Sequence, residues 1–172
     1  MKLRLFGTAN DSIVDGPGIR FAVFVQGCVH NCEGCHNPNS HDINGGYDGD
    51  TDELLDKIFK NPLLDGVTFS GGEPFLHAKP LAYMAKKVHE KNMNVVTYTG
   101  FDFEYLVENA TEENGYMELL ENTDILIDGK FVLAERSIDL MFKGSRNQRI
   151  IDVKKSLEEG KAVRHEIDEQ NL

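Results

Sequence analysis

The sequence is poor in basic side chains and has no long apolar run. Its 172 residues include 18 lysines and arginines against 29 aspartates and glutamates, a formal net charge of −11. Without surplus basic side chains to neutralise phosphates, the chain does not fit a general nucleic-acid or anionic-membrane binder. No run approaches the roughly 20 apolar residues of a membrane-spanning helix. We therefore expect neither a nucleic-acid partner nor a membrane.

Cysteine is scarce, and its placement is informative. All three cysteines lie in residues 27–38, "GCVHNCEGCHNP". An odd number packed this closely does not build a disulfide framework and indicates reduced thiols. We expect no targeting segment, because Gly7, Asn10 and Asp11 interrupt any apolar run behind Lys2 and Arg4. A cytoplasmic protein is the expectation.

The remaining composition is that of a globular protein. Hydrophobic residues make up 40% of the chain, and its length suits one domain with a sizeable core. We expect a single domain over residues 1–152. Residues 153–172 are expected to form a polar, mostly acidic tail without a chemical role.

Strand and helix patterns alternate along the chain. The helical stretch 50–61 has Asp50 as a candidate N-cap with Glu53 three residues on. Alternation of this kind predicts an α/β fold with a parallel sheet. Predicted strands cover 20–26, 66–70, 94–99, 124–128 and 148–152; predicted helices cover 50–61, 80–91 and 103–121, the last broken near Asn114-Gly115. The predicted buried stripes are Leu54, Leu55, Ile58 and Phe59 in the first helix and Leu81, Met84, Ala85 and Val88 in the second.

Chemically interesting residues follow four of these strands. They are residues 28–36, 71–73, 99–100 and 128–130. The carboxyl ends of parallel strands form the active-site rim of α/β folds, so these four loops are expected to converge. The chain is too short for the eight βα units of a closed barrel. A partial, open parallel β/α barrel is therefore predicted.

The cysteine loop itself is a candidate metal centre. Cys28, Cys32 and Cys35, at spacings of four and three, can face one centre when a loop carries them. Structural zinc usually takes four ligands from two paired knuckles; a histidine could complete such a site, but there is no second knuckle. A 4Fe–4S cluster usually takes four cysteines, so three would leave one iron without a protein ligand. Zinc and inert thiols remain as alternatives. The histidines available for zinc are His30, His36 and His41.

The motif "CVHNCEGC" after a strand resembles the radical S-adenosylmethionine enzymes. "DGPGIRFAVFVQGC" with "CHNP" is similar to the activases of glycyl-radical enzymes within that superfamily. "IDGKF" and "GSRNQRIID" resemble the activating proteins of anaerobic (class III) ribonucleoside-triphosphate reductase. The resemblance runs from about Ser12 to Asp152. It implies the partial barrel of the radical S-adenosylmethionine type.

The resemblance also implies an oxidoreductase activity. S-adenosylmethionine would bind the open iron of the 4Fe–4S cluster and be cleaved reductively. The resulting 5′-deoxyadenosyl radical would abstract hydrogen from a glycine of the anaerobic reductase. A small electron donor such as a flavodoxin or ferredoxin is implied, and so is anaerobic function.

The resemblance assigns the S-adenosylmethionine contacts to four segments. Gly71, Gly72 and Glu73 would receive the methionyl ammonium, although a plain Gly-Gly turn before a helix at Pro74 explains them equally well alone. His36 would lie against the adenine, with Gly34 and Cys35 lining the nucleoside. The remaining candidates are Thr99, Asp128 and Lys130, of which Asp128 would bind the ribose or a cation. Each of them is also explicable as part of an ordinary strand exit or solvated turn.

Two further segments are candidate contacts to the protein partner. In "VDGPGIR", the resemblance places Asp15 and Gly16 near the incoming glycine loop, and Arg20 would order this turn or touch the partner. In "GSRNQR", Arg146 and Arg149 are possible anchors. The alternative for both segments is a tight turn.

Three other functions stay open. One is activation of another glycyl-radical enzyme, such as pyruvate formate-lyase. A second is a non-catalytic zinc-binding interaction module. A third is a radical enzyme acting on a small molecule, which would require an enclosed pocket and no protein partner.

Overall fold

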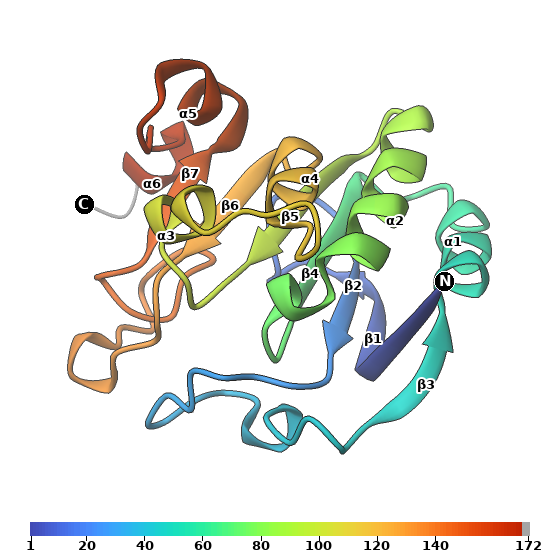
Figure 1. Cartoon of the computed structure of the whole chain (residues 1–172), viewed down its shortest axis with the longest axis horizontal. Coiled ribbons are helices and arrows are strands. Elements are labelled where there is room, and N and C mark those ends of the chain that lie inside the picture. Colours follow the sequence, from blue (N-terminus) through green and yellow to red (C-terminus); the bar gives the residue numbers. More distant parts are fainter. Residues whose placement is uncertain (170–172) are drawn as a thin grey trace.

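The computed structural model describes residues 1–169 and shows an α/β fold built on one seven-stranded sheet (Figure 1). The strand order is β3-β1-β2-β4-β5-β6-β7. The outermost strands β3 and β7 do not pair, so the sheet is open rather than closed. The strands are β1 (Lys2–Ser12), β2 (Arg20–Val25), β3 (Tyr47–Asp50), β4 (Gly66–Gly71), β5 (Asn94–Tyr98), β6 (Ile125–Asp128) and β7 (Arg149–Asp152).

The sheet is parallel only in its centre. Strands β2, β4, β5 and β6 pair in parallel, as predicted. The prediction of a parallel sheet is wrong for β7, which pairs antiparallel with β6. The connection between these two strands contains only a short 3₁₀ helix, and without a helical crossover the chain returns in the opposite direction. Antiparallel β1 and β3, which were not predicted, extend the other side of the sheet.

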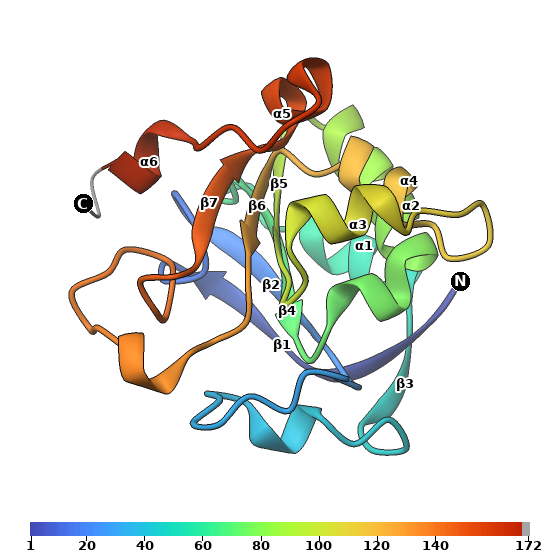
Figure 2. The same ribbon diagram turned by 60° about the vertical axis from the view of Figure 1, so that its left-hand side comes forward.

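The helices form where the apolar periodicity predicts them. Asp50 caps the first helix by accepting from the backbone amides of Asp52 and Glu53, at 2.9 and 3.3 Å. Figures 1 and 2 show α1 to α4 gathered on one face of the sheet. The helices are α1 (Thr51–Phe59), α2 (Ala78–Glu90), α3 (Phe103–Glu108), α4 (Tyr116–Glu121), α5 (Val153–Glu159) and α6 (Glu166–Glu169), with 3₁₀ turns at Pro38–Ser40, Pro74–His77 and Leu133–Glu135.

The core lies between these helices and the central strands. Of the predicted helical stripes, seven positions are buried, whereas Phe59 is 39% exposed and was wrongly predicted. Phe59 is the last residue of α1, where the helix leaves the sheet. No helix among residues 1–169 is both long and apolar enough to span a bilayer.

The segment expected as a tail includes α5 and α6. Its backbone returns to β7, since Asp152 N donates to Val163 O at 2.9 Å and His165 N donates to Ile150 O at 2.8 Å. Asp168 is buried, and its carboxylate accepts from Lys143 Nζ at 2.7 Å. This buried ion pair joins α6 to the loop of residues 129–148.

Candidate functional site

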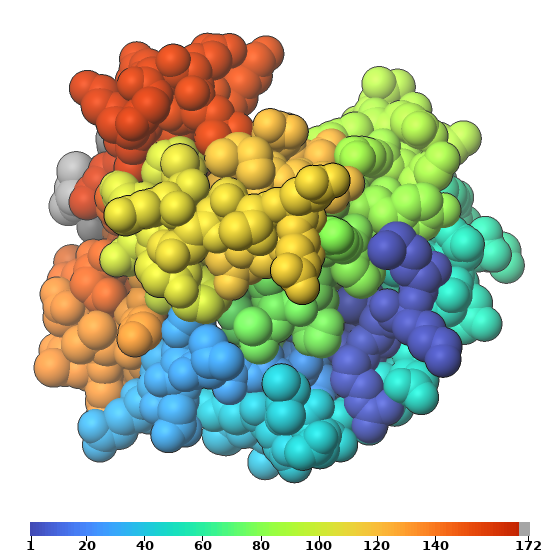
Figure 3. Space-filling model, viewed as in Figure 1, coloured from blue at the N-terminus to red at the C-terminus, as the bar shows by residue number. Residues whose placement is uncertain are grey.

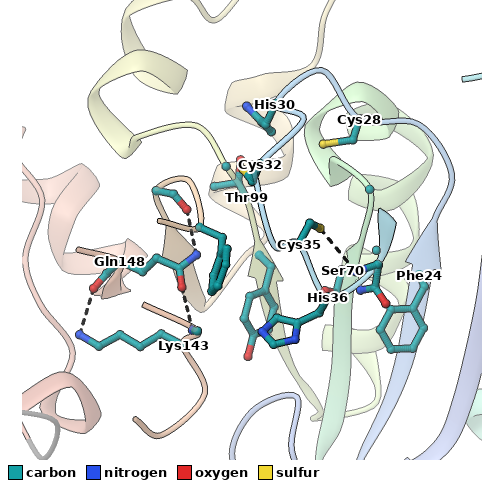
Figure 4. A pocket seen from close by; sticks show the side chains of 18 of the residues that line it. Phe24, Cys28, His30, Cys32, Cys35, His36, Ser70, Thr99, Lys143 and Gln148 are labelled. Carbon is teal, nitrogen blue, oxygen red and sulfur yellow. Dashed lines mark hydrogen bonds between the residues drawn. The ribbon is translucent and has the colours of Figure 1, made fainter. Parts of the chain in front are cut away.

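A cavity of about 450 Å³ opens at the carboxyl ends of the parallel strands. All three cysteines line it, together with residues from the exits of β4 and β5 and from the loop of residues 129–148 (Figure 4). In the space-filling view the cysteine loop, in blue, lies against this orange loop (Figure 3). The predicted residues that line the cavity are Asp15, Cys28, Cys32, Cys35, His36, Gly71, Gly72 and Thr99.

The cysteine loop is held by backbone contacts at both of its ends. Gly27 N donates to Ser40 O at 2.6 Å, and Cys28 N donates to His41 O at 3.2 Å. Buried Gln26 adds side-chain bonds to two further carbonyls of residues 39–42. These contacts close residues 27–41 into a loop directly after β2.

The three thiols are free and half-buried. Cys35 Sγ accepts from Asn37 N at 3.4 Å and lies 3.3 Å from His41 Nε2. Burial raises the pKa of the Cys28 thiol. Among residues 1–169, no three His, Cys, Asp or Glu side chains gather closely enough to hold one metal ion.

The Gly71-Gly72 segment forms the wall next to the cysteine loop. A Cβ at Gly71 would lie 2.5 Å from Val25 N, and one at Gly72 would lie 2.2 Å from Gly27 O. Gly71 also has φ +99°, which side chains other than glycine rarely adopt. Glycine is therefore required here by the close approach of the end of β4 to the end of β2.

Glu73 is completely buried and does not line the cavity. Its carboxylate accepts from Gly100 N at 2.8 Å, from Thr99 Oγ1 at 2.9 Å and from Phe75 N at 3.0 Å. It also contacts His30 Nε2 at 2.6 Å. A 3₁₀ helix starts at Pro74, so the turn-before-helix interpretation describes the local backbone.

The 4Fe-4S single cluster domain model matches residues 14–151 of this chain. A Salmonella typhimurium anaerobic ribonucleoside-triphosphate reductase-activating protein is 34% identical over 147 residues, covering 79% of this chain and 90% of the relative. The Vibrio cholerae protein of that name is 32% identical over 149 residues, covering 80% and 90%. The chain belongs to this activating-protein family. A Clostridium pasteurianum pyruvate formate-lyase-activating enzyme is also 36% identical over 136 residues, 75% of this chain and 53% of that enzyme.

Within the activating-protein fold, His36 forms part of an aromatic wall. Its ring meets Phe131 edge-on, with centroids 5.4 Å apart. Gly34 does not line the cavity; a Cβ there would lie 2.8 Å from Leu133 Cδ1. The cavity has further lining residues that the sequence did not assign to a cofactor, although many of them lie in the quoted motifs and His30 and His41 were named as possible zinc ligands. They are Val14, Phe24, His30, Asn37, His41, Ser70, Tyr98, Gly100, Gly129, Phe131, Leu140, Phe142, Lys143, Gly144 and Gln148.

Asp128 and Lys130 lie outside the cavity lining. Asp128 is buried and accepts from Phe103 N at 2.8 Å and from Arg149 Nε at 3.0 Å. Burial raises the pKa of Asp128, while Arg149 opposes that rise. Lys130 is exposed. The Asp128 carboxylate thus accepts hydrogen bonds from two residues of the chain itself.

The predicted partner-contact residues divide into buried and exposed ones. Arg20 is fully buried and donates to Thr68 Oγ1 at 2.7 Å and to Pro17 O at 2.9 Å, so it orders the turn. Burial lowers the pKa of Arg20 to about 10. Gly16 packs on Arg20, whereas Arg146 is exposed. Arg149 pairs with Asp128 and Glu104 of the same chain.

Proposed function

We propose that this chain is a radical S-adenosylmethionine activase of anaerobic ribonucleoside-triphosphate reductase. One observation carries the proposal: the three cysteines of the sequence line a single open cavity beside the Gly71-Gly72 segment. Membership of the activating-protein family supports it. The catalytic unit would be residues 1–152, with the open sheet acting as the partial barrel of this superfamily.

The donor set fits a 4Fe–4S cluster. Cys28, Cys32 and Cys35 would each bind a different iron, so their sulfurs need not meet at one point as they would around a single zinc ion. The sequence holds no fourth cysteine. One iron would therefore stay open to the amino and carboxylate groups of S-adenosylmethionine.

The walls of the cavity fit the rest of S-adenosylmethionine. Carbonyls of the Gly71-Gly72 segment, which lines the cavity, would receive the methionyl ammonium, because the Glu73 carboxylate already accepts from several groups of the chain. His36 and Phe131 offer an aromatic wall for the adenine. Thr99 is the candidate on the ribose side.

The bound cluster would supply one electron, received from a small flavodoxin- or ferredoxin-type donor. With that electron, the cluster held by Cys28, Cys32 and Cys35 would supply reductive cleavage of a carbon–sulfur bond of S-adenosylmethionine to methionine and a 5′-deoxyadenosyl radical. That radical would take a hydrogen atom from a glycine Cα of the reductase, which would leave a glycyl radical and 5′-deoxyadenosine. The chain's role is to hold both cofactors at a cavity that a polypeptide loop can enter.

The test is anaerobic reconstitution with iron and sulfide, followed by dithionite and S-adenosylmethionine. We expect a brown protein that forms 5′-deoxyadenosine, and a glycyl-radical electron paramagnetic resonance (EPR) signal when the anaerobic reductase is added. A colourless protein holding one zinc ion, or no 5′-deoxyadenosine with and without reductase, would overturn the proposal.

Because a pyruvate formate-lyase-activating enzyme is also similar to this chain, pyruvate formate-lyase is the second candidate partner. The same assay should therefore include pyruvate formate-lyase in a parallel arm. A glycyl radical only in the lyase arm would reassign the partner while leaving the radical chemistry intact.

A further inference from the structure

His30 lies between two of the proposed cluster ligands, Cys28 and Cys32, yet its side chain is directed away from solvent. The side chain is only 5% exposed, and its Nε2 lies 2.6 Å from Glu73 Oε1 (Figure 4 shows the ring beside Cys28 and Cys32). A carboxylate oxygen accepts, so the Nε2–H of His30 donates. The contact joins the cysteine loop after β2 to the loop after β4, across 43 residues of sequence.

The acceptor in this pair is rigid. Glu73 is 0% exposed, and bonds from Gly100 N, Thr99 Oγ1 and Phe75 N fix both of its oxygens. Hydrogen bonds to an ionised group inside a protein are stronger than neutral ones. The carboxylate is therefore a fixed point to which the exits of β4 and β5 are both attached.

Packing leaves the His30 ring little freedom. A Cβ at position 100 would lie 2.4 Å from its Cδ2, so glycine at that position makes room for the ring. Phe101 meets the ring edge-on, with centroids 4.5 Å apart. The backbone amides of His30 and Asn31 also interact with the Cys28 sulfur. His30 thus stands between two proposed ligands in the sequence and contacts the Glu73 anchor with its side chain.

We infer that His30 is a positioning residue that, through Glu73, fixes the cluster-binding loop against the ends of β4 and β5. This role rests on the proposed function, and it goes beyond it by naming what aligns the cluster with the Gly71-Gly72 wall. Groups that orient metal ligands from outside the coordination shell commonly affect affinity or activity by 10- to 100-fold.

The test compares three variants after anaerobic reconstitution. His30→Leu removes the donor, while His30→Gln keeps an amide N–H that can reach Glu73. His89→Leu is the matched control, since His89 Nε2 forms a similar pair with Asp124 Oδ2 at 2.7 Å, and neither residue lines the cavity. The readouts are iron per chain, the change in the EPR spectrum of the reduced cluster on titration with S-adenosylmethionine, and alkylation rates of the three thiols in metal-free protein.

We expect His30→Leu to weaken the spectroscopic response to S-adenosylmethionine roughly tenfold and to speed thiol alkylation, or to lose the cluster altogether. His30→Gln should recover most of either loss, and His89→Leu should match the wild type. A His30→Leu protein with wild-type titration and alkylation, or equal losses in all three variants, overturns the inference. If the wild type assembles no 4Fe–4S cluster, the proposed function fails, whereas the alkylation rates still decide whether His30 holds the loop.

Discussion

Arg149 donates two hydrogen bonds to the buried carboxylate of Asp128, from Nε at 3.0 Å and from Nη2 at 2.5 Å. The same guanidinium donates two more to Glu104 at 3.0 and 2.7 Å. Strand β7 is thereby tied to β6 and to α3. The sequence made Asp128 a candidate ligand contact and Arg149 a candidate partner contact. The structure shows that each of them has a hydrogen-bond partner inside the chain.

Replacing Arg149 should destabilise the fold. Arg149→Ala would leave the Asp128 carboxylate buried without its counter-charge, and we expect a loss of about 3 kcal/mol in the free energy of unfolding. Urea unfolding at neutral pH measures it. The control is Arg146→Ala, an exposed arginine three residues away, which should change stability by less than about 0.5 kcal/mol. Equal stabilities of the two variants would show that the Asp128 pair contributes nothing.

Glu104 should give stability that depends on pH. The hydrogen bond from Arg149 lowers the pKa of Glu104 below its ordinary value. A lowered carboxyl pKa stabilises the fold above the ordinary pKa, and this contribution disappears as the pH falls through the folded-state value. Since the side chain is 56% exposed, we expect Glu104→Gln to cost under about 1 kcal/mol at pH 7.

Unfolding of wild type and Glu104→Gln between about pH 7 and pH 3 tests this sign. The difference between the two proteins in the free energy of unfolding should shrink toward zero at the acid end of this range. Asp128, whose raised pKa acts in the opposite sense, is present in both proteins and its contribution largely cancels. Glu108→Gln on the same helix serves as the control. A difference that grows on acidification would contradict the pairing.

Gly100 should not tolerate a methyl group. In Gly100→Ala the new Cβ would lie 2.4 Å from His30 Cδ2, and forcing the ring aside should cost about 1–3 kcal/mol. Gly7→Ala is the control, because no atom lies within 4 Å of a Cβ there. Thermal unfolding of both metal-free variants makes the comparison. An unchanged melting temperature for Gly100→Ala would mean that the His30 ring is free to move.

His41 should raise the midpoint potential of the proposed cluster. Its Nε2 lies 3.3 Å from Cys35 Sγ, and a hydrogen bond to a ligand sulfur favours the reduced, more negative cluster. His41→Ala should therefore lower the midpoint potential of the cluster. The potential of His41→Gln should lie between the potentials of His41→Ala and the wild type. An EPR-monitored redox titration gives the values. Identical potentials for all three proteins would exclude a donating role for His41.

Local signals in the sequence predict much of the fold and part of the site. Apolar runs marked β2, β4 and β5, and the Asp50 cap marked the start of α1. Strand β1, which lies between β3 and β2, was missed because Gly7, Asn10 and Asp11 break its alternation of polar and apolar residues. Only pairing with β2 and β3 makes this segment a strand.

The sequence by itself determined which chemistry is available: three thiols at spacings of four and three, no fourth cysteine, and glycines at 71 and 72. These are local properties, fixed by residue type and spacing. Tertiary structure alone decided which side chains meet. His30 reaches Glu73, Lys143 reaches Asp168 and Arg149 reaches Asp128 across 43, 25 and 21 residues. Sequence spacing does not encode such contacts, because they depend on the strand order that burial of the whole core selects.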